Sequence, residues 1–287
     1  MSHSKQLREL FDSRRLLQAP GVFDGLSALL VERAQFPLAF LSGASFSFTR
    51  FGRPDLGLIG MAEVAQTVRI IRDRVSLPLL VDADTGFGNA LNVQRTVREF
   101  EAAGASAIQL EDQVMPKRCG HMQGKQVIAT AEMVGKVKAA LDARHDSNTV
   151  IIARTDALAV EGFDSALQRA AAYLDAGADA LFIEGPRELA QMTTIARAFP
   201  DVPLVHNLVE GGRSPVSTAA ELVQLGYRIA LHPAMLVHLF AKIAPAFLER
   251  LTLEGGTAGF QHEILDLDGI NALLGAAESL EESQRYA

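Results

Sequence analysis

The sequence predicts an α/β protein built as a single (β/α)8 barrel. Three observations favour this fold: eight short apolar runs recur along the chain, stretches with helical periodicity separate them, and polar residues follow most of the runs. The chain has 287 residues, 48% of them hydrophobic, a length that one barrel domain commonly reaches. We therefore expect residues 1–287 to form one catalytic domain, with a helical extension that begins near residue 236.

The expected strands include continuous apolar blocks such as LPLLVDA and TVIIAR. Such blocks are typical of parallel strands that are buried on both faces. The eight runs are Gly21–Phe23, Leu38–Ser42, Leu79–Ala83, Ala107–Glu111, Thr149–Arg154, Leu181–Glu184, Leu204–Asn207 and Arg228–Leu231. Their regular alternation with helices favours a closed barrel over an open doubly wound sheet.

Helical periodicity fills the intervals between these runs. The expected helices are Leu26–Arg33, Met61–Arg72, Ala90–Ala103, Thr130–Asp142, Phe163–Ala176, Glu188–Ala198, Thr218–Leu225 and an apolar one from Leu236 to Arg250. Gly104, Gly177 and Gly226 follow three of them, where a left-handed C-terminal cap is expected. The last helix is a candidate for subunit packing.

Composition excludes several classes of function. A net charge of -7 argues against nucleic-acid binding, and the scattered Lys and Arg residues argue against an anionic membrane surface. The chain has no apolar run of the ~18 residues that span a bilayer, no dinucleotide GxGxxG and no GxxxxGK[ST] motif. With a polar N-terminal stretch and one cysteine, a reducing cytoplasmic setting is the simplest interpretation.

Polar residues follow six of the expected strands in succession. Barrel enzymes carry their active sites at the carboxyl ends of the strands. The residues at these ends are Asp82, Asp84, Glu111, Asp112, Arg154, Asp156, Glu184, His206, Asn207 and His232, and Asp55 lies in the loop after the second strand. Any one carboxylate in such a place is more often a helix cap or a solvated loop residue, but the whole series indicates a site.

Several carboxylates at one barrel opening would repel one another unless a cation lies among them. Oxygen ligands suit Mg²⁺, with Mn²⁺ as an alternative, and the sequence has no Cys/His spacing typical of zinc. Because Mg²⁺ usually keeps several waters, some of the carboxylates are expected to hold it through water.

The loop Gln113–Gly124 carries Cys119 among Lys117, Arg118 and His121. Nearby positive charge lowers a thiol pKa and favours the thiolate. A mobile loop that brings an acid or base to a closed site is a common design, whereas the alternative is an incidental surface cysteine. A second small-residue segment, Leu41–Ser45, leaves backbone N–H groups free for an anion, although such turns are common.

Seven segments together resemble the isocitrate lyase/phosphoenolpyruvate mutase superfamily over roughly residues 8–260. They are SGAS (42–45), GRPDLG (52–57), DADTGFGN (82–89), EDQ (111–113), KRCGH (117–121), ARTDA (153–157) and EGGRSP (210–215). The resemblance implies a barrel whose eighth helix is exchanged between subunits, in a homotetramer arranged as a dimer of dimers.

The resemblance also implies roles for individual residues. It places Mg²⁺ near Asp82, Asp84 and Glu111, with Asp55 in the outer shell, and the substrate α-carboxylate on Ser42, Gly43 and Ala44. It gives Arg154 an assisting role in binding the substrate and makes the loop that carries Cys119 the gate. The catalytic candidates are Cys119, His121 and Arg154. The further substrate-binding candidates are Glu184, Asn207 and His232, the last of which departs from the aromatic residue that relatives often have there.

Within the superfamily, the KRCGH loop resembles the lyase branch, and EGGRSP resembles the dimethylmalate lyase group. His238 stands where methylisocitrate lyases typically have an arginine, which argues against a tricarboxylate substrate. Pro233 stands where oxaloacetate hydrolases tend to have serine, and Phe40 replaces a tyrosine of the methylisocitrate lyases.

These features predict a Mg²⁺-dependent carbon–carbon lyase that cleaves a 2-hydroxy dicarboxylate, a substituted malate such as 2,3-dimethylmalate, or else 2-methylisocitrate, to pyruvate and a second carboxylic acid. Cys119 would protonate the departing fragment. The alternatives are an oxaloacetate decarboxylase or hydrolase, a phosphonate mutase, and a non-catalytic member that only binds a keto acid.

Overall fold

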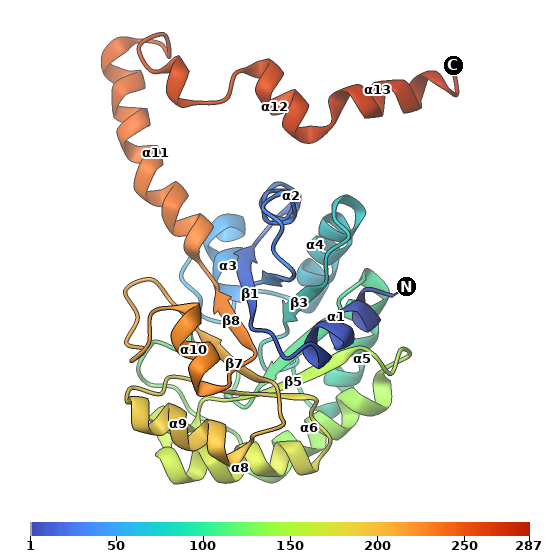
Figure 1. Ribbon diagram of the computed structural model, residues 1–287, viewed down its shortest axis with the longest axis vertical. Coiled ribbons are helices and arrows are strands. Elements are labelled where there is room, and N and C mark those ends of the chain that lie inside the picture. The colour runs from blue at the N-terminus through green and yellow to red at the C-terminus, as the bar shows by residue number, and fades with distance from the viewer. Residues whose placement is uncertain (1) are drawn as a thin grey trace. The chain divides into compact units, whose positions relative to one another are not determined.

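The computed structural model describes residues 2–287 and contains a closed barrel of eight parallel strands (Figure 1). Each strand pairs with its neighbours in chain order, and the last closes on the first, with Leu17 opposite Ile229. The strands are β1 (Leu17–Val22), β2 (Ala39–Leu41), β3 (Leu79–Asp82), β4 (Ala107–Glu111), β5 (Val150–Thr155), β6 (Ala180–Ile183), β7 (Leu204–Asn207) and β8 (Ile229–His232). The predicted barrel is confirmed.

The first strand differs most from its expected bounds, because it begins at Leu17 rather than Gly21. Gln18 and Pro20 interrupt the apolar pattern of this strand, so its first half has no apolar run. Pro20 nevertheless aligns with His232 of β8 in the ladder.

All eight expected helices are present. The helices are α1 (His3–Asp12), α2 (Gly25–Arg33), α3 (Gly43–Phe51), α4 (Met61–Arg74), α5 (Ala90–Ala103), α6 (Thr130–Ala143), α7 (Ala157–Val160), α8 (Phe163–Asp175), α9 (Leu189–Ala198), α10 (Ala219–Leu225), α11 (Met235–Glu254), α12 (Leu267–Leu274) and α13 (Ala276–Gln284), with a 3₁₀ turn at Gln261–Glu263. Gly104, Gly177 and Gly226 all have positive φ, as the predicted left-handed caps require.

Side-chain alternation along the strands divides the core into two layers. One layer fills the barrel and includes Phe40, Leu80, Ile152 and Phe182. The other lies between the strands and the surrounding helices, and the intervening strand residues such as Ile151 belong to it. Since successive strand residues point to opposite faces, a residue two positions beyond a barrel-filling one faces the barrel opening.

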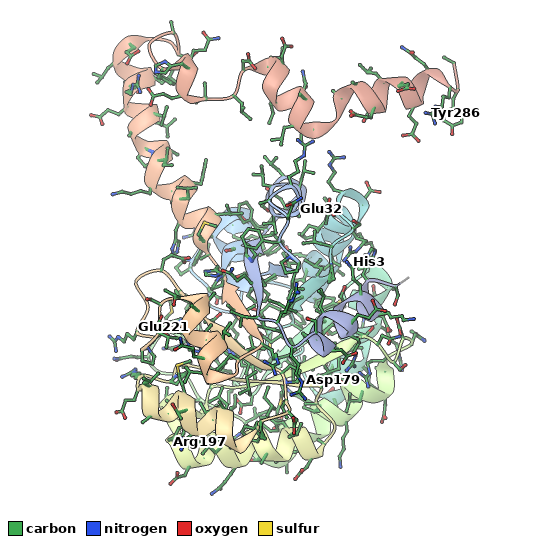
Figure 2. All side chains as sticks on the ribbon, viewed as in Figure 1. His3, Glu32, Asp179, Arg197, Glu221 and Tyr286 are labelled. Carbon is green, nitrogen blue, oxygen red and sulfur yellow. The ribbon has the colours of Figure 1, made fainter. Side chains whose placement is uncertain are left out.

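Helix α1 closes the amino-terminal end of the barrel. Its Leu7 is fully buried in the barrel-filling layer. Arg8 of this helix donates to Asp179 at 2.7 Å, and Arg144 donates to the other carboxylate oxygen of Asp179 at 2.8 Å. Figure 2 shows where Asp179 lies relative to His3 of this helix. The polar residues predicted for the site lie at the opposite end of the barrel, where the strands end.

The described residues divide into two compact units, one ending at His238 and the other formed by Leu239–Ala287. The second unit exposes many large apolar side chains, which are Leu239, Phe240, Ile243, Leu248, Leu251, Leu253, Ile264, Leu265, Leu267, Leu274, Leu280 and Tyr286. Among residues 2–287, no helix is both long enough and apolar enough to cross a membrane.

Candidate active site

The predicted site residues of β3 to β6 continue the barrel-filling face of their strands. Leu80 is followed by Asp82, Ile152 by Arg154 and Phe182 by Glu184, each two positions later. The side chains of Asp82, Asp84, Glu111, Arg154 and Glu184 are all buried. The sequence prediction that these residues meet at one opening is therefore reproduced by the geometry.

A lysine of the loop 113–124 lies among the carboxylates. Lys117 Nζ lies 2.6 Å from Asp55 Oδ1 and 2.9 Å from Asp84 Oδ1, and all three side chains are at most 5% exposed. Burial raises the pKa of Asp84 to about 6, although Lys117 opposes this effect. Burial also raises the pKa of Glu111 well above its usual range. The single positive charge of Lys117 therefore does not balance the negative charge of the carboxylates around it.

Arg154 joins the two sides of the opening. Its Nε and Nη2 donate to the two oxygens of Asp156, at 2.9 and 3.1 Å. Its Nη1 lies 3.3 Å from Glu111, its Nη2 lies 3.8 Å from Glu184, and the guanidinium stacks over Phe182. These contacts hold the guanidinium rigidly, in the position of an electrostatic stabiliser for an anion.

Helix α3 begins directly at the end of β2, which the sequence analysis did not anticipate. Ser42 is its N-cap, and its side chain accepts a hydrogen bond from the backbone N–H of Ser45. A Cβ at Gly43 would lie 3.0 Å from Asp82 Oδ2 and 3.2 Å from Asp84 Oδ1, so only glycine fits here without displacement. The segment Ser42–Ala44 therefore offers first-turn N–H groups, which suit an anion, next to the carboxylates.

The loop Gln113–Gly124, called the gate loop below, is fastened over this opening. Cys119 N donates to the carbonyl of Asp55, and Lys125 Nζ donates to both the Gly120 carbonyl and Asp156. A Cβ at Gly120 would collide with the Arg154 guanidinium and the Glu184 carboxyl. The absence of a side chain at Gly120 thus allows the loop to approach Arg154 closely.

The thiol of Cys119 differs from the expectation of a lowered pKa. Burial raises its pKa, and the nearby carboxylates of Asp55 and Glu184 raise it further. A hydrogen bond from the His121 backbone and the charge of Arg154 lower the pKa, but by less. The expectation was wrong chiefly because the thiol is partly buried, and also because the positive charge of Lys117 is already engaged by Asp55 and Asp84. Cys119 is therefore a protonated thiol, which suits an acid rather than a nucleophile.

His121, Glu184 and Asn207 form a polar cluster beside Arg154. Asn207 Nδ2 donates to Glu184 Oε2 at 2.9 Å, and His121 Nε2 lies 3.5 Å from Glu184 Oε1. The buried Asn207 Oδ1 has no hydrogen-bond partner in the part of the chain that the structure describes. This oxygen and the neighbouring cations are available to a ligand.

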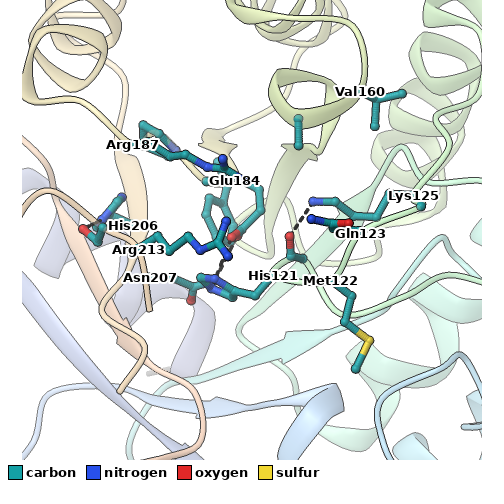
Figure 3. Close-up of a pocket in the computed structure, with 17 residues that line it drawn as sticks. His121, Met122, Gln123, Lys125, Val160, Glu184, Arg187, His206, Asn207 and Arg213 are labelled. Atoms are coloured by element: carbon teal, nitrogen blue, oxygen red, sulfur yellow. Dashed lines mark hydrogen bonds and ion pairs between the residues drawn. The ribbon is translucent and has the colours of Figure 1, made fainter. Parts of the chain in front are cut away.

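Two cavities open on this arrangement. The smaller, about 170 Å³, lies on the carboxylate side; its lining includes Ser42, Ala44, Asp55, Asp82, Lys117, Cys119, Arg154 and Asn207, with apolar walls from Phe40, Phe48, Val209, Pro233 and Ala234. The larger, about 290 Å³, lies on the side of β6 and β7 and shares Gly120, His121, Phe182 and Asn207 with the first (Figure 3).

His232 lines neither cavity. In β8 the barrel-filling residues are Ile229 and Leu231, so His232 falls on the alternate face. Burial lowers its pKa. The predicted residues Gly43, Asp84 and Glu111 are also absent from both linings, but each contacts Asp82, Lys117 or Arg154, which line the smaller cavity. The structure gives His232 no such contact with the described site.

A buried network that was not predicted from the sequence lies behind the site. Asp112 directly follows β4 and accepts hydrogen bonds from Thr155 Oγ1 and Tyr173 Oη, both at 2.7 Å, and from Arg169 Nη1 at 3.3 Å. The backbone N–H of Asp156 also donates to it at 2.9 Å. Asp112 thus positions the end of β5 rather than the substrate. Because side chains alternate in direction along the chain, Glu111 faces the barrel opening and Asp112 faces away from it, and this alternation could have distinguished the two from sequence.

The donors present fit a divalent cation bound partly through water. No group of three or more His, Cys, Asp or Glu side chains within residues 2–287 is arranged to hold an ion directly. However, the buried Glu111 Oε1 and Gln109 Oε1 have no hydrogen-bond partner among the described residues. All-oxygen donors with unsatisfied buried atoms suit a hydrated Mg²⁺ or Mn²⁺.

Comparison with known proteins agrees with this geometry. The family model described as phosphoenolpyruvate phosphomutase matches residues 7–250. The chain belongs to the phosphoenolpyruvate mutase/isocitrate lyase superfamily. It is 41% identical to the 2,3-dimethylmalate lyase of Eubacterium barkeri, over 100% of this chain and 99% of that protein. It is 45% identical to the 2-methylisocitrate lyase of Aeropyrum pernix, over 91% of this chain and 82% of that protein.

Solved structures of this superfamily match the whole fold. A crystal structure of 2,3-dimethylmalate lyase has a TM-score of 0.94 at 30% identity, covering 100% of this chain and 96% of that one. Phosphonopyruvate hydrolase in complex with oxalate and Mg²⁺ has a TM-score of 0.90 at 32% identity, covering 100% and 99%. The predicted family is confirmed, and the chain is a carbon–carbon lyase of this superfamily.

Proposed function

We propose that the protein is a Mg²⁺-dependent lyase that cleaves the C2–C3 bond of a substituted 2-hydroxy dicarboxylate, giving pyruvate and a second carboxylic acid. One observation carries the proposal: buried carboxylates, Arg154, the N-terminus of α3 and the Cys119 thiol all converge on one cavity. The similarity to lyases of dimethylmalate and methylisocitrate supports the same reaction.

Asp82, Asp84 and Glu111, with Asp55 behind them, would hold the metal, which supplies a Lewis acid and a template for the C1 carboxylate and 2-oxygen when bound. The N–H groups at Ser42–Ala44 would receive the C1 carboxylate. Arg154, fixed by Asp156, would stabilise negative charge on the 2-oxygen.

Cys119 would donate the proton that completes the reaction. A base at the site would accept the 2-hydroxyl proton. The C2–C3 bond would then break, giving the 2-oxo group of pyruvate and leaving the electron pair as a carbanion on C3 of the departing carboxylate fragment. The thiol, kept protonated by burial, lies in the lining of the same cavity. The gate loop above it would exclude bulk water, so that the fragment takes its proton from Cys119. His121 would orient this end of the substrate through Glu184.

The walls of the smaller cavity favour alkyl substituents on the substrate. Phe40, Phe48, Val209 and Pro233 line it beside the polar groups. Methyl groups at C2 and C3 would remove part of this apolar surface from water, at about 25 cal/mol per Å². A 2,3-dialkylmalate fits this lining better than oxaloacetate, which has no alkyl group.

Pyruvate release, followed with a lactate dehydrogenase coupled assay, tests the proposal. 2,3-Dimethylmalate, 2-methylisocitrate and oxaloacetate would be compared with and without Mg²⁺, and the second product of each identified. Pyruvate with propionate from dimethylmalate is the expected result. Carbon dioxide or oxalate from oxaloacetate alone would instead establish a decarboxylase or hydrolase. Binding of Mg²⁺ and oxalate without turnover on any substrate would establish a non-catalytic member.

We further propose that the enzyme is a homotetramer, in which the apolar side chains of Leu239–Ala287 are covered by another subunit. Leu253 is 78% exposed, Leu267 74% and Phe240 69% within a single chain. An exposed apolar surface of this extent is typical of an association site. The exchange of a helix between subunits, implied by the family resemblance, would cover it.

A further inference from the structure

Asp156 connects the gate loop to the arginine of the site. Its side chain is fully buried and directly follows β5. Arg154 Nε donates to one of its carboxylate oxygens at 2.9 Å, whereas Arg154 Nη2 and Lys125 Nζ both donate to the other, at 3.1 and 2.6 Å. Burial alone would raise the pKa of Asp156, but the charges of Arg154 and Lys125 lower it. One carboxylate therefore pairs with two buried cations.

Lys125 directly follows the gate loop, and its side chain is 2% exposed. Its ammonium also donates to the Gly120 carbonyl in the middle of that loop (Figure 3). We call Lys125 seated when its ammonium pairs with Asp156. Because a buried ammonium needs a partner or water, lifting the centre of the loop would break the contact of Lys125 with Gly120 or with Asp156.

Asp156 is held in place from outside the gate loop. Its backbone N–H donates to Asp112 Oδ1 at 2.9 Å. The same network holds the chain just after the loop, where Ile128 N donates to the Asp112 carbonyl and Arg169 Nη1 donates to Ile128 O, both at 2.8 Å. A movement of the loop centre would therefore change the contact of Lys125 with Asp156 rather than the position of Asp156.

The net charge beside a bound anion depends on whether Lys125 is seated. The charges of Arg154 and Asp156 alone cancel, whereas Arg154, Asp156 and Lys125 together carry a net positive charge. Glu111 and Glu184 also lie near the Arg154 guanidinium, at 3.3 and 3.8 Å. A second cation on the shared carboxylate thus leaves more of the Arg154 charge available to a ligand, an effect that burial strengthens.

We infer that Lys125 is a positioning residue that couples closure of the gate loop to anion binding at Arg154. The inference rests on the proposed lyase function and assigns it a further residue. A seated Lys125 keeps Cys119 in the lining of the smaller cavity and strengthens the field of Arg154 where negative charge develops on the substrate. Because coupling between two sites is reciprocal, an anion on Arg154 favours the seated loop to the same extent.

Hydrogen–deuterium exchange of the gate loop measures this coupling without turnover. The amides of Arg118, Cys119 and Met122 are the reporters, because each donates a hydrogen bond in the closed loop. Wild type, Lys125→Met and Lys125→Gln would be compared at saturating Mg²⁺ with and without oxalate, and Lys138→Met, an exposed position on α6, is the matched control. Oxalate should slow exchange about tenfold in wild type and control, and hardly at all in the Lys125 variants.

Exchange in β4 and β5 should be equal in all four proteins, as expected if the barrel is intact. Oxalate should bind Lys125→Met about tenfold more weakly than it binds the wild type, by the same reciprocity. Mg²⁺ affinity should not change, because Lys125 pairs with Asp156 rather than with the predicted metal carboxylates. A general loss of structure would weaken both ligands. Turnover of 2,3-dimethylmalate should fall about tenfold in kcat.

Equal protection of the gate loop by oxalate in the wild type and the Lys125 variants would overturn the inference, as would no protection in the wild type. Lysine-dependent protection without pyruvate release from any of the three substrates would sustain the coupling and refute the lyase proposal. Wild-type kcat for 2,3-dimethylmalate in Lys125→Met would sustain the lyase and refute the coupling.

Discussion

At the scale of single residues, burial decides the behaviour of the groups in this site more than the charge of sequence neighbours does. Cys119 follows Lys117 and Arg118 in the chain, yet its pKa is raised rather than lowered. Lys117 is committed to Asp55 and Asp84, and the Arg118 side chain donates to the Gln123 carbonyl. Sequence proximity therefore overestimated the positive field at the thiol, because it does not reveal which partners a cation has already found.

Replacing the thiol tests its role as the acid. Cys119→Ser should reduce kcat by ~10²–10⁴-fold, the usual contribution of a positioned general acid, because serine is a far weaker proton donor. Oxalate affinity should be unchanged, since the carboxylate side of the cavity is untouched. Stopped-flow turnover and oxalate titration measure the two quantities. Normal turnover of the serine variant would refute the role of Cys119.

Stability should depend on pH through His206. Burial lowers the pKa of this imidazole to about 4, below its ordinary value of 6.5. Between these values the unfolded chain binds a proton that the folded chain does not, so stability is retained above pH 6.5 and lost as the pH falls toward 4. The slope is at most about 1.4 kcal/mol per pH unit.

Urea denaturation at pH 7.5, 6.5 and 5.5 would measure this slope in wild type and His206→Gln at one protein concentration. The variant should have a shallower decline of the unfolding free energy. Other histidines, such as His3 and His232, also have lowered pKa values, so some slope should remain. Identical slopes in both proteins would mean that His206 does not carry the effect.

At the scale of elements, the predicted strand pattern already brought most residues of the candidate site to one end of the barrel. The strand ends of β3 to β7 supply Asp82, Glu111, Arg154, Glu184 and Asn207 because alternation continues from the barrel-filling residues. Alternation applied strictly would also have set Asp112 and His232 apart. The ion pairs of Lys117 and Lys125 were not predictable, because they depend on how a folded loop crosses the barrel mouth.

The gate loop should be sensitive to one methyl group. Gly120→Ala places a Cβ against Arg154 and Glu184, so the loop must move outward. A shift of about 1 Å near the reacting groups can reduce turnover ~10²-fold. Gly135→Ala, in α6, is the matched control because nothing lies within 4 Å of its added Cβ. Comparable kcat values for the two variants would show that close approach of the loop is not required.

At the scale of the whole molecule, the barrel and its family were predictable, whereas assembly remains a prediction. Many large apolar side chains of residues 239–287, such as Phe240 and Leu253, are exposed within the single chain, and the sequence alone indicated only an apolar helix. The surface that would cover them belongs to another subunit, so the sequence of one chain does not identify it directly. The barrel is different, because its core is formed within one chain.

Light scattering coupled to size-exclusion chromatography tests the assembly. The wild type should have the mass of a tetramer. Phe240→Glu combined with Leu253→Glu should yield smaller species, because charge on a buried apolar interface is strongly unfavourable. Leu91→Glu, which changes an exposed leucine of α5, serves as the control. A wild-type monomer, or a tetramer in the double variant, would contradict the proposal.

The alternation in β5 also determines where this chain tolerates changes in length. Arg154 faces the barrel opening, whereas Thr155 faces the helices and donates to Asp112. Inserting one residue between Val150 and Arg154 would exchange these faces, so that the guanidinium would enter an apolar layer and a hydroxyl would replace it at the opening. Stability and catalysis would fail together. A change of one residue in the length of β5 is therefore far more damaging than the same change in a loop, because a loop has no alternating faces to exchange.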